Sequence, residues 1–289
     1  MVRRLAVAFS AFLLVPAYAS DVVYPGGGVF AQVNDGAGSS TTLTLVNLDS
    51  LAAQYTLYFY NDDGTPWTTL STTGPLSGTL PPLGSAIIKT NGGGSAQLQG
   101  WAYLSTPYVT DVNGLGHYTI AGTAVFTIAL PGNANLGTAP NPAAQATVPL
   151  DTGYDSVFAI PFDHAVTSFG NSAVFGVALA NTWQQTTALT VNVVAKDLSG
   201  ATIPTAVTSI QLPGNGHTSF LLTDKFPELA GKQGVVVFSP VVSDTTNNPY
   251  GLINALGLRA NAEGTSLSTV APLIPCYYVS NANGTGCTN

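Results

Sequence analysis

The chain has 289 residues, of which 7% are charged, and its 14 acidic residues outnumber its 7 basic ones. Nucleic acids and anionic lipids are bound by basic surfaces, so this charge balance argues against both as partners. Soluble domains usually contain about 25% charged residues; the low content here is common in exported β-proteins, and the length allows two domains of roughly 100–150 residues.

The first 19 residues have the layout of a secretory signal peptide. Arg3 and Arg4 give a positive start, an apolar run extends from Leu5 to Val15, and Ala17 and Ala19 place small residues where signal peptidase cleaves. That run is too short to cross a bilayer of roughly 30 Å as a helix, although an N-terminal membrane anchor is the alternative. We therefore predict a secreted or cell-surface protein whose mature chain has no transmembrane segment.

After this signal, one pattern occurs twice. Six segments of the first half recur in the same order in the second half, about 132 to 136 residues further along. The matched segments are 43–47 with 177–181, 55–60 with 189–194, 62–64 with 197–200, 80–84 with 212–216, 98–100 with 232–234, and 120–126 with 253–259. Six matches in order indicate an internal repeat. The expected domains are 20–150 and 151–273, followed by a tail, 274–289.

Each copy has the periodicity of short strands. Apolar and polar residues alternate along Tyr55–Tyr60, and Leu189–Val194 repeats that pattern. Turn residues interrupt such runs every 8–15 residues. We predict an all-β chain of two tandem immunoglobulin-like antiparallel β-sandwich domains, each with about seven strands. One helical turn is expected at Thr223–Ala230, with Thr223 as its cap and Gly231 at its end.

The pattern resembles a family of secreted bacterial proteins with tandem immunoglobulin-like sandwich repeats. The resemblance rests on Thr42–Asn47, Phe59–Gly64, Leu212–Phe220 and Phe226–Gly231, and it covers nearly the whole mature chain. Domains of this kind usually serve as extracellular spacers, adhesion modules or accessory domains, and they share no catalytic residues. The resemblance thus implies a fold and a location, but no chemistry.

Cys276 and Cys287 are the only two cysteines in the sequence. Because export permits oxidation, we expect them to form one small disulfide loop in the tail. A metal pair is the alternative, but the two cysteines lack CxxC spacing and have no histidine nearby. We expect no metal and no cofactor.

Motifs that carry known chemistry are missing from the sequence, including GxSxG, HExxH, the P-loop and the EF-hand loop. His117, His164 and His217 are not at metal-binding spacings from one another, so we interpret them as surface or turn residues. Asp163 beside His164 could form half of a hydrolase triad, but neighbouring residues in an extended segment point to opposite sides.

Asp62 and Asp63 precede Gly64, which is ordinary turn chemistry. Asp197 and Gly200 occupy the matching turn of the second copy and favour a structural role for it. A calcium site on the first turn is the alternative, since calcium prefers hard oxygen ligands on loops.

Aromatic residues distinguish the first copy from the second. Five rings of copy one, at Tyr58, Tyr60, Trp67, Trp101 and Tyr103, stand where copy two has Asn192, Val194, Ile203, Val235 and Val237. The fold therefore does not require aromatic residues there. We predict that these five residues form a ligand-binding face, since exposed rings stack on sugars or contact proteins. Alternatively, the rings pack against copy two or fill a wider core, and Trp183 could belong to such a contact.

The hypothesis for function is a non-catalytic extracellular binding or surface protein that recognises a glycan, a surface polymer or another protein. One alternative is an assembly subunit of a surface structure, because β-rich chains of low charge can associate edge to edge. The other is a secreted polymer hydrolase, which would need polar groups that converge in a pocket.

Overall fold

The computed structural model describes residues 27–106, 109–110, 116–117, 119–128, 144–152, 157–165, 173–182, 188–241, 253–261 and 266–273. The expected signal peptide, Trp183 and the tail with both cysteines lie outside these residues. We call residues 27–152 the N-terminal half and residues 157–273 the C-terminal half.

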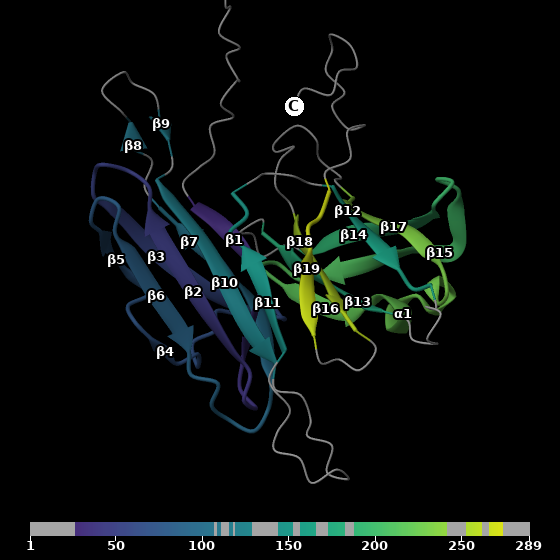
Figure 1. The fold of residues 1–289 in the computed structure, drawn as a ribbon, viewed down its shortest axis with the longest axis horizontal. Helices are drawn as coiled ribbons and strands as arrows, with labels where there is room; N and C mark the ends of the chain where they lie inside the picture. The colour runs from purple at the N-terminus through teal and green to yellow at the C-terminus, as the bar shows by residue number, and fades with distance from the viewer. Residues whose placement is uncertain are drawn as a thin grey trace, which may run out of the picture.

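The N-terminal half contains two antiparallel sheets (Figure 1). The first sheet has the order β1 (Gly27–Asp35), β7 (Leu98–Ser105), β3 (Ala53–Asn61), β5 (Ser77–Leu80). The second has the order β11 (Ala144–Pro149), β10 (Ile120–Ile128), β2 (Ser40–Asn47), β6 (Ser85–Thr90), β4 (Thr72–Thr73). A small ribbon is added by β8 (Val109–Thr110) and β9 (Gly116–His117).

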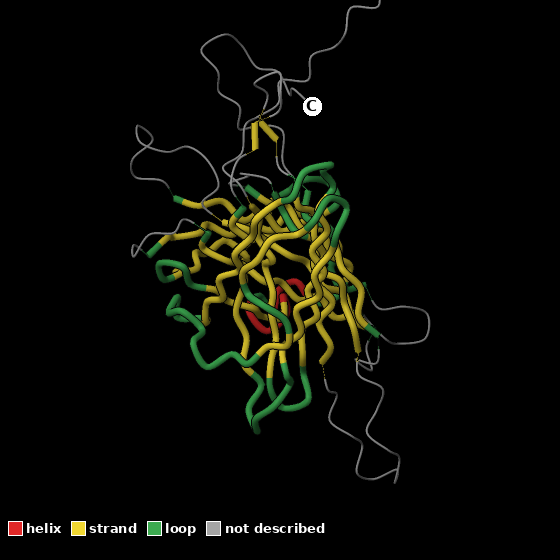
Figure 2. The backbone as a smooth tube through the Cα atoms, turned by 90° about the vertical axis from the view of Figure 1, so that its left-hand side faces the viewer, coloured by secondary structure: helices red, strands yellow, loops and turns green. Residues whose placement is uncertain are grey.

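The C-terminal half has the same strand order, except that β4 has no counterpart among its described strands. One sheet contains β12 (Phe158–Asp163), β17 (Gln233–Pro240), β14 (Leu189–Asp197), β15 (Thr202–Leu212). The other contains β16 (His217–Leu221), β13 (Val174–Asn181), β18 (Ile253–Ala260), β19 (Leu267–Val270). Figure 2 shows strand along most of the described backbone. The predicted all-β, antiparallel sandwich fold is confirmed.

Alternating burial explains why these segments pair into layers. Along β3, Tyr55, Leu57 and Phe59 are buried in the core, while Gln54 before them and Tyr58 between them are exposed. This is the period of two expected for a strand with one buried face. Each half has its own apolar core built from such faces.

Equivalent asparagines hold the two Leu-Pro turns that follow β5 and β15. The Asn47 side-chain amide donates to the Pro81 carbonyl at 3.0 Å, and the Asn181 amide donates to the Pro213 carbonyl at 2.8 Å. Both asparagines are buried, so each bond satisfies the amide of a side chain that is removed from water. The repeated asparagine is therefore a structural residue in both halves.

The helical segment lies near its predicted place but begins differently. The structure has α1 (Leu222–Lys225) followed by the 3-10 turn η2 (Pro227–Leu229). The residue before α1 is Leu221, and no side chain caps the helix. The prediction of Thr223 as the cap is therefore wrong, because Thr223 lies inside α1. Gly231 follows with a φ of 72°, which suits the end of a helical segment.

The two halves pack tightly against each other. Every residue of β1 is buried, and Ala178 of β13 and Leu256 of β18 join the apolar core of the N-terminal half. The edge strands β11 and β19 lie side by side at this junction (Figure 1), where the Thr269 hydroxyl donates to the Thr147 carbonyl. The outer face of the sheet that contains β1 and β7 is therefore partly covered by the C-terminal half.

Candidate functional site

Four of the five predicted aromatic residues lie on the outer face of the sheet formed by β1, β7, β3 and β5. In the β3–β7 pairing, Tyr58 lies opposite Tyr103, and Tyr60 lies opposite Trp101. The ring centroids of the first pair are 6.3 Å apart and those of the second are 4.9 Å apart, and both pairs are stacked. Cross-strand pairing therefore brings residues more than 40 positions apart into one aromatic strip.

Trp67 does not belong to this strip. Its side chain is 5% exposed and packs in the core of the N-terminal half. The equivalent Ile203 is also buried, in the other core. The expectation that Trp67 lies on an outer face is wrong, because the position is a core position in both halves.

Trp101 is fully buried at the junction of the two halves. It forms an apolar cluster with Val29 and with Ala180 of the C-terminal half. Its indole N–H donates to the Asn215 carbonyl at 2.7 Å. The expectation of an exposed Trp101 is wrong for a physical reason: the C-terminal half covers this end of the strip, and the ring supplies packing area and one hydrogen bond.

The uncovered end of the strip consists of three tyrosines, Tyr58, Tyr60 and Tyr103, which we call the tyrosine face. Tyr58 is 48% exposed, whereas Tyr60 and Tyr103 are half-buried. Burial raises the pKa of Tyr60, and the nearby Tyr58 and Tyr103 phenols raise it further. The Tyr60 hydroxyl therefore stays neutral at neutral pH, and a phenol hydroxyl can both donate and accept a hydrogen bond. The face offers stacked rings and phenol hydroxyls to a ligand.

The turn that contains Asp62, Asp63 and Gly64 joins the halves. The Asp62 carboxylate lies 2.7 Å from His217 Nδ1, and its carbonyl accepts a bond from the His217 backbone N–H at 3.0 Å. A Cβ added at Gly64 would lie 1.9 Å from the Gly214 carbonyl oxygen, so the two backbones approach as only glycine allows. The predicted turn is present, and it also serves as a contact.

His217 is a residue that the sequence interpretation missed. It was expected to be an ordinary turn histidine, but only 3% of it is exposed and it pairs with Asp62. The two residues are 155 positions apart, and no sequence signal links them. Asp62 is therefore engaged in the junction.

A hydrogen bond from Thr65 lowers the pKa of Asp63. No group of three or more metal-ligating side chains occurs in the described residues.

Asp163 and His164 do not form a catalytic pair. The Asp163 carboxylate accepts bonds from the Gln233 side chain and from the Ala165 backbone. His164 is 3% exposed, so it is not the surface residue that was expected, and its Nδ1 lies 3.2 Å from the Ala173 carbonyl. Its ring packs beside Phe162. Burial lowers the pKa of His164, so it is a neutral core residue. The His117 side chain lies outside the described residues.

Comparisons with known proteins identify no family for this chain. No family model matches the chain, and no curated protein matches it. One similar solved structure is the pilus adhesin SpaC from Lactobacillus rhamnosus GG, at 12% identity and a TM-score of 0.16. That alignment covers 82% of this chain and 25% of the adhesin. Among the described residues, no helix has the length and hydropathy of a membrane span.

Proposed function

We propose that this chain is an exported, non-catalytic binding protein that recognises a glycan or similar surface polymer through its tyrosine face. The observation that supports the proposal is the stacked Tyr58–Tyr103 pair, which lies on an outer face with Tyr58 48% exposed. The equivalent positions of the C-terminal half hold Asn192 and Val237, so the strand pairing itself does not need these rings.

The tyrosine face is held in place at the covered end of the aromatic strip. Tyr60 stacks on Trp101, and Trp101 is fixed by the contact with Asn215. Rings that are already ordered lose little conformational freedom when a ligand binds, and this improves affinity. A sugar ring presents apolar C–H faces and hydroxyls, which match aromatic faces and phenol groups.

The experiment measures how much of the protein, prepared without residues 1–19, is retained on each of a panel of insoluble polysaccharides. We expect Tyr58→Ala and Tyr103→Ala to weaken retention at least about tenfold, as for a central aromatic contact. The matched control is Ile87→Ala, because Ile87 is 63% exposed on β6 of the opposite sheet. The proposal fails if no polysaccharide retains the unmodified protein, or if the tyrosine variants bind as well as the control.

A further inference from the structure

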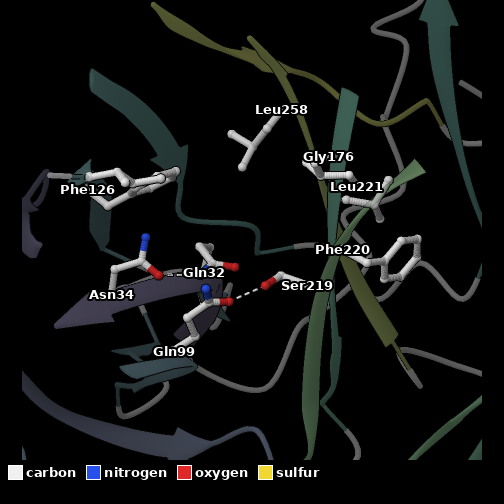
Figure 3. Close-up of a pocket in the computed structure, with 11 residues that line it drawn as sticks. Gln32, Asn34, Gln99, Phe126, Gly176, Ser219, Phe220, Leu221 and Leu258 are labelled. Atoms are coloured by element: carbon white, nitrogen blue, oxygen red, sulfur yellow. Dashed lines mark hydrogen bonds between the residues drawn. The ribbon is translucent and has the colours of Figure 1, made fainter. Parts of the chain in front are cut away.

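A cavity of about 240 Å³ lies between the two halves, on the other side of Trp101 from the tyrosine face. Along β7, Gln99 lies two residues before Trp101 and Tyr103 lies two residues after it, on the same face of the strand. The cavity is therefore separated from the tyrosine face by the buried indole. Figure 3 shows its polar side, formed by Gln32, Asn34, Gln99 and Ser219.

The polar side contains a buried acceptor that lacks a donor. Gln32 and Asn34 are 3% and 2% exposed. The Gln32 amide nitrogen donates to the Asn34 side-chain oxygen, and the Ser219 hydroxyl donates to the Gln99 side-chain oxygen. Gln32 Oε1 has no hydrogen-bond partner in the described structure. Figure 3 shows this oxygen pointing away from Asn34, toward the side of the cavity where Ser219 lies.

A buried carbonyl that is left without a hydrogen bond destabilises the folded state. Buried polar groups in folded proteins are nearly always paired with protein, water or a ligand. The Gln32 oxygen therefore favours an occupant that donates an N–H or O–H bond in this cavity. Its position between the halves is one where binding sites commonly occur.

The remaining lining restricts the class of occupant. The described lining residues include no charged side chain, and apolar groups such as Phe126, Leu221 and Leu258 complete the lining. Neutral amides both donate and accept, as hydroxyl groups do. At about 240 Å³ the cavity is smaller than the roughly 300–1,000 Å³ typical of drug-sized ligands.

We propose that this cavity binds one neutral, hydroxylated ring, such as a single sugar unit. A ring hydroxyl donates to Gln32 Oε1, and the apolar C–H groups of the ring face Phe126 and Leu258. This site is separate from the tyrosine face, and it stands or falls independently of the function proposed above.

Gly176 allows the cavity to be narrowed without strain. A Cβ there would lie 3.6 Å from the Phe220 carbonyl oxygen, 3.7 Å from Leu221 and 3.8 Å from Leu258, which are ordinary van der Waals distances. Gly176→Ala should therefore fold normally and reduce the space for a ring. Gln32→Leu removes the acceptor at similar size. It also removes the amide that donates to Asn34, so we expect some loss of stability, and thermal melts check that the variant is folded.

The test is titration of the protein without residues 1–19 with glucose, galactose and N-acetylglucosamine, followed by nuclear magnetic resonance. The titration extends to about 50 mM, which saturates a site whose Kd is near 1 mM. We expect saturable shifts for at least one sugar, a loss of affinity of about tenfold in Gln32→Leu, and weaker binding in Gly176→Ala. Gln54→Leu is the matched control, since Gln54 is exposed on β3, and it should bind like the unmodified protein.

Three results would overturn the proposal. The first is a lack of binding by all three sugars, which would leave water as the occupant of the cavity. The second is unchanged affinity in Gln32→Leu and Gly176→Ala when thermal melts show both variants folded. The third is loss of binding in Tyr58→Ala instead, which would assign the sugar to the tyrosine face.

Discussion

The turn at Asn61–Gly64 and the turn at Asp197–Gly200 have the same backbone but different surroundings. In each, the glycine N–H donates to the carbonyl of the first residue at 2.9 Å, and the glycine φ is 84° in one and 82° in the other. The first turn contacts the C-terminal half through Asp62. At the position equivalent to Asp62, the second turn has Leu198, which is 77% exposed.

The difference shows that one backbone pattern serves two purposes. Strand order and turn geometry are shared, whereas the contact between the halves depends on side chains that the shared geometry does not require. Trp101, Asp62 and His217 are all of this kind. Substituting them should therefore damage the junction more than the sandwich of either half.

The largest expected effect is that of Trp101→Val, which installs the residue found at the equivalent position, Val235. We expect a loss of about 3–5 kcal/mol in the free energy of unfolding, because the change leaves a cavity and removes the bond to Asn215. Urea unfolding followed by circular dichroism measures the loss. Val235→Ala is the control and should lower stability less; equal losses would contradict a special role for the junction.

A smaller effect is expected from Gly64→Ala compared with Gly200→Ala. An alanine at positive φ costs about 1–2 kcal/mol at either position. Only at Gly64 would the new Cβ also meet the Gly214 carbonyl, at 1.9 Å, whereas nothing lies within 4 Å at Gly200. Thermal unfolding should show a clearly lower Tm for Gly64→Ala. Matching Tm values would mean that the close approach of the two turns does not stabilise the protein.

The smallest effect concerns pH and His164. Burial lowers the pKa of this residue below its usual 6.5, so the unfolded chain takes up a proton more readily than the folded one. The stability that neutral His164 gives the folded state is fully present above pH 6.5. It is lost as the pH falls through the pKa that His164 has in the folded protein. We expect His164→Phe to flatten the decline in stability between pH 7 and pH 5, where each pKa unit corresponds to about 1.4 kcal/mol. An unchanged slope in urea unfolding would contradict this.

Much of the fold could be predicted from local sequence. The alternation along Tyr55–Tyr60 and the glycine turns are properties of short segments, and the structure reproduces them. Exposure was harder to predict. Tyr58 and Trp101 both lie on the outer face of one sheet, yet one is 48% exposed and the other is fully buried. The cover over Trp101 comes from Asn215, more than 100 residues away, and strand periodicity holds no information about it.

The side-by-side edges of β11 and β19 also determine where other chains could add to this protein. A sheet grows only at an edge whose backbone groups are open, and these two edges shield each other. Recruitment of a foreign strand at the junction would first have to separate the halves. Addition to the intact protein is therefore directed to far edges such as β5. The β15 edge is a poorer acceptor, because Pro204 cannot donate a backbone hydrogen bond. A fibre built from this chain would have to use such outer edges, with the junction kept inside each repeating unit.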